Sequence, residues 1–338
     1  MRTTPICVSL GNSEVSQDPV TLTDSAHLAQ PLLASRLKVG DTIGIVSPAA
    51  PVTEDQRAQV DRGVEVLQEY GFKVEFAPNA LGNSLGYSAS ARQKADDINQ
   101  MFRSDAVKAI MCSQGGFNSN SVLPYLDYNL IRANLKIFIG ISNITVLLNA
   151  IYAKTGLITF HGNDLIWGFG RDLTEYEVSE FLIRMVGAEA GVITHHSTWN
   201  CVRKGSAAGR LIGGNLDSLL QLAGTEHFPD CSGAILFLEA FGEEPGGTRP
   251  NRLSAGLHQL QQLGVLAKIN GLWLGHYKHE SGVKMEQIVQ EVAVDYSFPI
   301  VSCDDFGHNT PNTTIPIGCE ARIDATNARI ELLSRFLV

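Results

Sequence analysis

Residues 109–126 read AIMCSQGGFNSNSVLPYL, which is an apolar strand, a small polar turn and an apolar helix-like pattern. The strand covers Val107 to Met111, and Ser119 stands where the turn passes into the helix. Backbone N–H groups at a helix start are unpaired, and the helix dipole is positive there. A serine at this place can attack a carbonyl while those N–H groups bind the oxyanion, so Ser119 is a candidate nucleophile.

The same serine also has a simpler interpretation, because Ser at a helix start is commonly only an N-cap. The stretch does not match the G-x-S-x-G pattern of α/β hydrolases, since Phe117 and Ser121 stand where the glycines would be. Gly115 and Gly116 permit positive φ and a close approach of the backbone to a substrate. The stretch by itself leaves both interpretations open.

Strands and helices alternate on both sides of this stretch, which is typical of a parallel sheet covered by helices. Ligands of such sheets bind at the carboxyl ends of the strands, and Ser119 follows such an end. The predicted N-terminal domain covers residues 37–165. Its expected elements are a buried strand within 38–51, helices at 60–70, 91–102 and 144–154, and strands at 72–76, 107–111, 136–140 and 157–160.

The rest of the chain divides into three further parts. Residues 1–36 are polar and read as a loosely held extension, of which Leu28 to Leu37 is expected to pack on the body. Residues 166–208 lose the strand–helix rhythm and are interpreted as a crossover between domains. The C-terminal domain, 209–338, is expected to be β-rich. Its predicted elements are helices near 216–222, 253–263 and 285–294, strands at 234–239, 271–275 and 299–302, and a β-rich close over 313–333.

Length and composition are those of a folded protein with two domains: 338 residues, 44% hydrophobic and 18% charged. A net charge of −9 and the lack of a Lys/Arg run argue against a nucleic-acid partner. The six cysteines show no C-x-x-C pair, so we expect reduced thiols in a cytoplasmic protein. We expect no membrane partner, because no signal-peptide pattern and no run near 18 apolar residues occurs.

Two residues of the C-terminal domain are candidate partners of a catalytic serine. Glu239 directly ends an apolar strand, although a charge there can simply mark the exit to solvent. His308 lies in a polar loop between two apolar strands, where a histidine is commonly a surface group. His161, which ends a strand of the first domain, is the rival base. No H-x-x-x-H or H-E-x-x-H pattern occurs, so neither a metal nor another cofactor is expected.

The segments together resemble the LD-carboxypeptidase family of serine peptidases, which includes the microcin C immunity peptidases. The resemblance runs from about residue 37 to the end, and the Gly115-to-Asn120 form looks closer to the microcin-immunity branch than to the murein branch. The segments that carry it are 40–49, 115–120, 123–128, 150–162, 209–216, 237–239, and the 307–308 loop leading to 315–318.

The resemblance implies a Rossmann-like N-terminal domain, a β-rich C-terminal domain and an active site between them. The family's Ser-His-Glu triad would make Ser119 the nucleophile, His308 the base and Glu239 its orienter. Family members are commonly homodimers, so a homodimer is expected. The remaining candidate residues are assigned to oxyanion and substrate binding: Gly115, Gly116, Asn120, His161 and Asn215.

The chain also departs from the family's usual pattern. Gly140-Ile141-Ser142-Asn143 stands where the family usually has Gly-Tyr-Ser-Asp, Asn163 replaces a proline, and Ala240 stands where an aspartate is common. The loop from Glu243 to Arg252 is a few residues longer than usual. The loss of two acidic groups near the site bears on which substrate is used.

The predicted function is a metal-independent serine carboxypeptidase or amidase that cleaves an amide near a free carboxylate. Two substrates fit, a murein tetrapeptide and a peptidyl- or aminoacyl-nucleotide of the microcin C kind. One alternative keeps the triad but passes the acyl group to an amine, as a biosynthetic amide-forming acyltransferase would. A catalytically weak binding protein is the third hypothesis, and the triad candidates speak against it.

Overall fold

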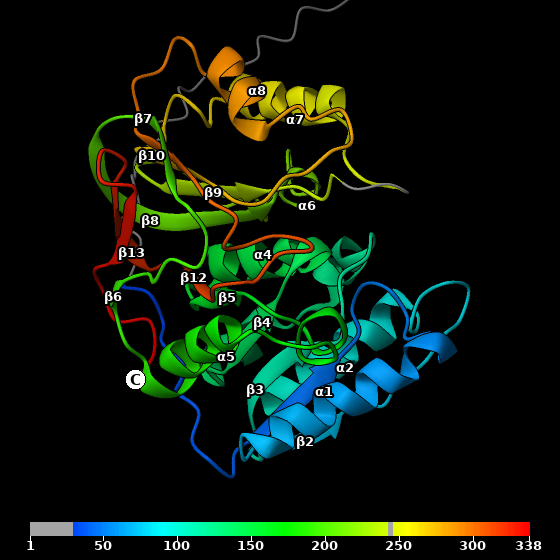
Figure 1. The fold of residues 1–338 in the computed structure, drawn as a ribbon. Coiled ribbons are helices and arrows are strands. Elements are labelled where there is room, and N and C mark those ends of the chain that lie inside the picture. Colours follow the sequence, from blue (N-terminus) through cyan, green and yellow to red (C-terminus); the bar gives the residue numbers. More distant parts are fainter. Residues whose placement is uncertain (1–29, 243–245) are drawn as a thin grey trace, which may run out of the picture.

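The computed structural model describes residues 30–242 and 246–338, and two sheets stacked above one another organise it (Figure 1). The first sheet has the strand order β12-β5-β4-β3-β1-β2. Every neighbouring pair among β1 to β5 is parallel. These strands are β1 (Thr42–Val46), β2 (Lys73–Phe76), β3 (Val107–Cys112), β4 (Ile137–Gly140) and β5 (Thr159–His161).

Helices alternate with these strands, as the sequence predicts, and their termini carry recognisable signals. The Ser90 side chain caps α2 by accepting a hydrogen bond from the Gln93 N–H, and Gly156 ends α4 in the left-handed conformation. The helical segments are η1 (Glu54–Gln56), α1 (Arg57–Glu69), α2 (Ala91–Arg103), η2 (Ser119–Tyr125), α3 (Tyr128–Ala133), η3 (Ser142–Ile144) and α4 (Thr145–Thr155).

The segment interpreted as a crossover has more regular structure than the sequence predicts. It contains two π-helical turns around one α-helix, and two strands that join the second sheet. The short elements carry little apolar periodicity, which is why sequence patterns miss them. They are η4 (Leu165–Phe169), α5 (Glu175–Leu182), η5 (Ile183–Gly187), β6 (Gly191–Val192) and β7 (Asn200–Arg203).

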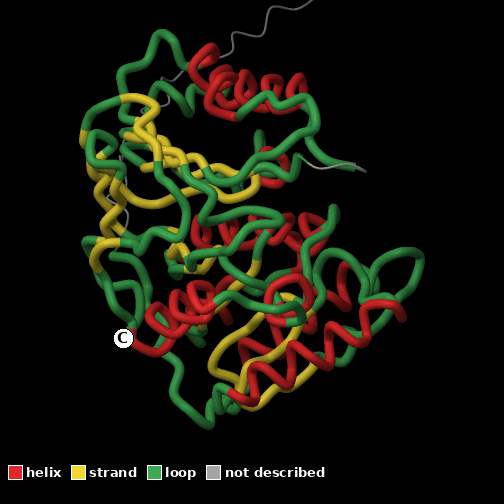
Figure 2. Tube along the Cα trace, in the orientation of Figure 1, coloured by secondary structure: helices red, strands yellow, loops and turns green. Residues whose placement is uncertain are grey.

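The second sheet is mixed and has the order β6-β14-β13-β8-β9-β10-β11-β7. Its centre, from β8 to β11, is parallel, and antiparallel strands flank it on both sides. Figure 2 shows α7 and α8 on the outer side of this sheet. Its elements are β8 (Ser206–Asn215), α6 (Leu216–Leu220), β9 (Ile235–Glu239), α7 (Pro250–Gln262), β10 (Gly271–Leu274), α8 (Met285–Val292), β11 (Ile300–Ser302), β13 (Glu320–Asp324) and β14 (Arg329–Leu332).

Helix α4 lies between the two sheets (Figure 1). Its residues are buried almost throughout, from Thr145 to Tyr152, so it lacks the polar face that a surface helix has. Asn149, in the middle of this helix, donates a hydrogen bond to the Gly213 carbonyl of β8 at 2.8 Å. The helix therefore joins the two domains through both apolar packing and a buried hydrogen bond.

Strand β12 (Ile315–Ile317) lies in the chain between β11 and β13, two strands of the second sheet, but pairs antiparallel with β5 of the first. The segment between β11 and β12, residues 303–314, therefore runs from one sheet to the other. This connection carries His308, and it places that residue at the junction of the two domains.

The two-domain α/β architecture that the sequence predicts is confirmed, with a mixed rather than simply β-rich second sheet. Of the extension, residues 1–29 lie outside the described part, whereas Ala34 and Leu37 are buried as expected. Within the described residues, no helix is long and apolar enough to cross a membrane. The five cysteines among them are free thiols, and Cys7 lies outside that part.

Candidate active site

The turn after β4 holds a serine in an unusual backbone conformation. Ser142 has φ of 62°, in the left-handed region that residues other than glycine rarely adopt. It begins η3, which α4 follows directly, so it sits on a sharp strand-to-helix turn. Gly140 makes the turn possible, since a Cβ at that position would lie 2.8 Å from the Ile144 side chain. Strained turns of this kind present nucleophiles in hydrolases.

The imidazole of His308 connects this serine to a carboxylate. His308 Nδ1 lies 2.8 Å from Glu239 Oε2, and His308 Nε2 lies 3.0 Å from Ser142 Oγ. With Nδ1–H donating to the carboxylate, the neutral ring accepts the Ser142 hydroxyl proton at Nε2. Serine, histidine and glutamate are thus joined in a row, the arrangement in which a histidine takes a proton from a serine.

The environment of the Glu239–His308 pair supports this arrangement. Glu239 ends β9 and is fully buried. Burial alone would raise the pKa of this carboxyl, but the charge and hydrogen bond of His308 outweigh it and lower the pKa. Burial would likewise lower the pKa of His308, and the Glu239 charge and hydrogen bond, together with Asp164, raise it above its ordinary value. The pair therefore favours a carboxylate that stabilises an imidazolium.

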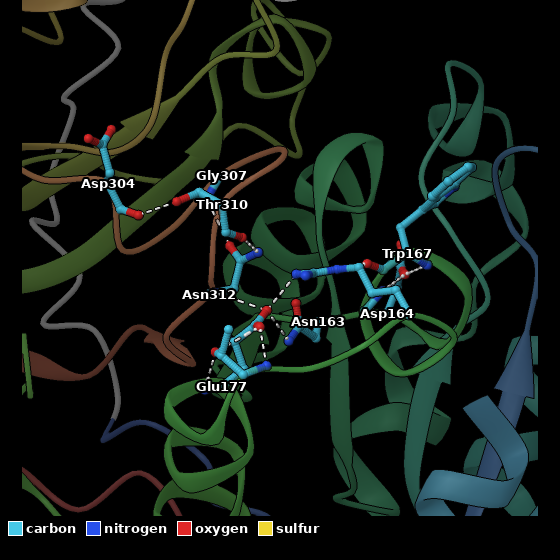
Figure 3. Close-up of polar contacts among 11 residues, drawn as sticks. Asn163, Asp164, Trp167, Glu177, Asp304, Gly307, Thr310 and Asn312 are labelled. Atoms are coloured by element: carbon cyan, nitrogen blue, oxygen red, sulfur yellow. Dashed lines mark hydrogen bonds and ion pairs between the residues drawn. The ribbon is translucent and has the colours of Figure 1, made fainter. Parts of the chain in front are cut away.

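A buried polar network fixes the loop that carries His308 (Figure 3). Asn312 Oδ1 accepts a hydrogen bond from the Gly307 N–H at 2.8 Å. The N–H of Asn312 in turn donates to Glu177 Oε1 of α5 at 3.3 Å, and Asn163 Nδ2 donates to the same oxygen at 3.1 Å. Arg171 forms an ion pair with this carboxylate at 2.5 Å. Asn163, one of the departures from the family pattern, thus helps to hold the histidine loop.

Ser119, the nucleophile predicted from the sequence, lies at the start of η2 as expected but does not meet His308. Its hydroxyl donates to the Asn143 carbonyl at 2.7 Å, and its N–H donates to Asn143 Oδ1 at 2.8 Å. The side chain is fully buried. Among the described residues the imidazole instead contacts Ser142, so this geometry gives the Ser119 hydroxyl no base. The sequence signal that could have indicated Ser142 is its position two residues after Gly140, which ends the predicted strand 136–140.

The glycine loop lies against the Ser142 turn. A Cβ on Gly115 would come 2.6 Å from Ser142 Cβ and 2.8 Å from Ser142 Oγ, so only glycine fits there. Gly116 has φ of 148° and packs against the Ala50 N–H in the same way. Gly115 therefore lies beside the Ser142 hydroxyl, and Gly116, the next residue of the loop, lies against Ala50. Asn120 is exposed and lies one residue beyond Ser119.

His161 and Asn215 are buried next to Glu239 and are not on an open surface. His161 is fully buried, with its ring 5.5 Å from that of Phe237, and neither ring nitrogen has a partner among the described residues. Burial lowers its pKa to about 4, so the ring is neutral near pH 7. Asn215 caps α6 and is the strand neighbour of Glu239. Both residues surround Glu239, and no exposed atom of His161 is available to a substrate.

Two further residues near the site, Asp164 and Trp167, stand in no sequence pattern that marks them as functional. Asp164 is buried at the start of η4, and burial raises its pKa to about 6. Its carboxylate accepts hydrogen bonds from the N–H groups of Trp167 and Gly168. Trp167 is 56% exposed, and its Nε1–H donates to Gln114 Oε1 at 3.0 Å, directly before the glycine loop. Within the described residues, no group of three or more His, Cys, Asp or Glu could hold a metal.

Comparison with known proteins agrees with this architecture. Residues 43–162 match the LD-carboxypeptidase N-terminal domain, and residues 208–323 match the LD-carboxypeptidase C-terminal domain. The microcin C7 self-immunity protein MccF of Escherichia coli is 34% identical over 91% of this chain and 98% of its own length. A probable murein peptide carboxypeptidase of Bacillus subtilis is 32% identical over 85% of this chain and 90% of its own.

A solved structure shows the same likeness in three dimensions. MccF in complex with glutamyl sulfamoyl guanosine superposes with a TM-score of 0.84 at 31% identity, covering 91% of this chain and 100% of that one. The matches therefore extend over both domains and over the junction between them. The chain belongs to the LD-carboxypeptidase family of serine peptidases.

Proposed function

We propose that this chain is a serine carboxypeptidase or amidase that uses a Ser142–His308–Glu239 triad and requires no metal. The observation that carries the proposal is the His308 ring, which lies 2.8 Å from the Glu239 carboxylate and 3.0 Å from the Ser142 hydroxyl. The strained φ of Ser142 supports the same assignment. In this proposal Ser142 replaces Ser119 as the nucleophile.

The proposed reaction follows from these positions. Ser142 Oγ attacks the carbonyl carbon of the scissile amide while His308 Nε2 takes its proton, and Glu239 stabilises the resulting imidazolium. His308 then protonates the leaving nitrogen, and water hydrolyses the acyl-enzyme by the same steps. The N–H of Asn143, which follows the nucleophile, and an N–H of Gly115 or Gly116 are the proposed oxyanion donors. Asn143 thereby takes the place predicted for Asn120.

The proposed substrate is an aminoacyl- or peptidyl-nucleotide with a free carboxylate, and a murein peptide is the competing substrate. MccF, a relative with both domains in common, has been solved with glutamyl sulfamoyl guanosine. Two aromatic side chains border the glycine loop: Phe117 is 85% exposed and Trp167 is 56% exposed. Exposed aromatic rings beside a nucleophile supply a surface on which a planar base can stack.

A substrate panel analysed by mass spectrometry tests the proposal. Glutamyl and aspartyl sulfamoyl nucleosides and a murein tetrapeptide are incubated with the full chain, with and without added amines, and Ser142→Ala serves as the blank. We expect cleavage of the acyl–nitrogen bond of the nucleoside compounds by the unmodified chain alone. Amide products with the added amine would support the acyltransferase alternative instead. Equal turnover by the Ser142→Ala variant would contradict the triad.

A further inference from the structure

An aromatic ring lies against the imidazole of His308. The centroid of the Phe241 ring is 5.0 Å from that of the imidazole, and the two ring planes make an angle of 40°. Ring pairs at this separation attract one another beyond the area that they bury. Since the two nitrogens of this imidazole already face Glu239 and Ser142, Phe241 is a third contact of the same ring.

The backbone around Phe241 is held on both sides. Its carbonyl accepts a hydrogen bond from the Thr248 N–H at 2.5 Å. Gly242 is packed so closely that a Cβ there would lie 2.3 Å from the Lys278 carbonyl oxygen. Thr248 is itself fixed, because its carbonyl accepts a hydrogen bond from the Tyr277 hydroxyl at 3.0 Å. A fixed turn therefore presents the aromatic ring to the imidazole.

Glu239 and Phe241 reach the imidazole from the same run of chain. Side chains two residues apart along a strand point to the same side, and Glu239 is the last residue of β9. Ala240, between them, is 1% exposed and stays away from the imidazole contacts. The end of β9 thus supplies both the carboxylate that binds Nδ1 and the aromatic group that packs on the ring.

A hydrogen bond and a packed ring restrain an imidazole in different ways. The bond from Nδ1 to Glu239 fixes one atom, but the ring can still tilt about that atom. A second ring packed on the imidazole resists this tilt, and the position of Nε2, which takes the serine proton, depends on it. The face of an aromatic ring also attracts a cation within roughly 6 Å of its centroid, so it favours the imidazolium.

We propose that Phe241 is a positioning residue for His308: its ring holds the imidazole in line with the serine hydroxyl and stabilises the imidazolium that forms when the serine proton is taken. This inference rests on the proposed function, in which His308 is the base. Phe241 acts through that base and takes no proton itself.

Other titratable groups surround the imidazole, and they set the background for a change at Phe241. Those that the structure describes are Glu239 of β9, His161 of β5, Asp164 at the start of η4, and the His276–Asp304 pair beside Gly307. A substitution of Phe241 leaves all of these groups in place. A shift in the protonation of His308 therefore reports on the aromatic ring.

The rate at which a fluorophosphonate probe labels the full chain, measured against pH, tests this role without knowledge of the substrate. Phe241→Leu keeps an apolar side chain against the imidazole but removes the aromatic face. We expect it to label roughly 3–10-fold more slowly at the pH plateau. Its acid limb should lie about half a pH unit lower, because the imidazolium loses the attraction of the ring and the base stays neutral at lower pH.

Two further variants make this test specific to the aromatic ring. Phe241→Tyr keeps the ring, so its rate should stay within roughly twofold of the unmodified chain, with the same acid limb. Phe228→Leu is the matched control, because Phe228 is another half-buried phenylalanine of the C-terminal domain. Among the described residues, Phe241 is the one aromatic side chain whose ring contacts that of His308, so Phe228→Leu should label normally.

Thermal unfolding of each variant shows whether it is folded. The inference is overturned if Phe241→Leu labels as fast as Phe228→Leu, or if its acid limb does not move to lower pH. A Phe241→Tyr variant as impaired as Phe241→Leu would overturn it as well, since the ring would then be irrelevant.

The probe also separates this inference from the proposed function. Label on the Ser142 peptide, with equal rates in Phe241→Leu and Phe228→Leu, would contradict only the role of Phe241. Label on the Ser119 peptide, with the slower rate and lower limb in Phe241→Leu, would contradict Ser142 as the nucleophile and support the inference. Undiminished label in His308→Ala would overturn both.

Discussion

The turns after β3 and β4 look alike along the chain and differ in what surrounds them. Each follows a buried parallel strand, contains glycine and leads through a serine into a helical segment. Ser142 has φ of 62° and its hydroxyl faces a histidine, whereas the Ser119 hydroxyl is bound to a carbonyl in a fully buried position. A serine is activated by the base that reaches it, so a favourable turn is not sufficient.

Replacing each serine in turn is the strongest way to break this comparison. We expect Ser142→Ala to lower kcat/KM by about 10⁴–10⁶-fold, because the members of a triad act as a unit. Ser119→Ala should stay within roughly tenfold, since it loses one hydrogen bond of ordinary strength. Steady-state kinetics of both variants measure this difference. The comparison is wrong if Ser119→Ala is the inactive variant.

The second prediction concerns Glu239, the carboxylate that contacts the histidine beside Ser142. Glu239→Gln keeps the shape of the side chain but loses the charge that stabilises the imidazolium, so kcat should fall by roughly 10²–10⁴-fold. Glu177→Gln, which alters another buried carboxylate near the same loop, is a useful comparison because it does not touch the ring. We expect Glu239→Gln to have the larger effect, and the reverse order would speak against Glu239 as the orienter.

The third prediction follows from the pKa of His308, which its carboxylate neighbours raise above the ordinary 6.5. The base acts only when neutral, so kcat/KM should rise about tenfold per pH unit and level off above that raised pKa. Burial raises the pKa of Asp164 to about 6, and the charge of Asp164 is among those that raise the pKa of His308, so the two groups are coupled.

Removing the Glu239 charge should move the acid limb of the pH profile in a predictable direction. In Glu239→Gln the burial of the ring is no longer outweighed, so the pKa of His308 should fall and the acid limb should move to lower pH. A pH profile of the residual activity measures the shift. Movement of the limb to higher pH would mean that another group is the base.

The smallest expected effect is that of a strong chelator. Because the proposed Ser142–His308–Glu239 triad requires no metal, dialysis against the chelator should leave kcat/KM unchanged. Activity before and after dialysis, with zinc added back to a portion, makes the measurement. Loss of activity that zinc restores would show that a metal contributes, and the comparison of the two turns would then be incomplete.

Several parts of this protein could be predicted from the sequence because their physical basis is local. Apolar periodicity and glycine ends predict α1, α2 and α4 to within a few residues of their bounds. Glu239 could be found because a carboxylate directly ends an apolar strand, and His308 because a polar loop separates two strands. Their pairing at 2.8 Å agrees with what the family resemblance implies, although their catalytic roles stay a prediction.

What the sequence by itself determined is thus the two-domain α/β fold, the family and two members of the proposed triad. Only the tertiary structure decided which serine meets the histidine, because that depends on β12 leaving the second sheet to pair with β5. Strand order is set by packing between residues far apart in the chain, and no local pattern records it. The segment from β11 to β12 therefore places His308 beside Ser142, and the equally plausible Ser119 remains a buried partner of Asn143.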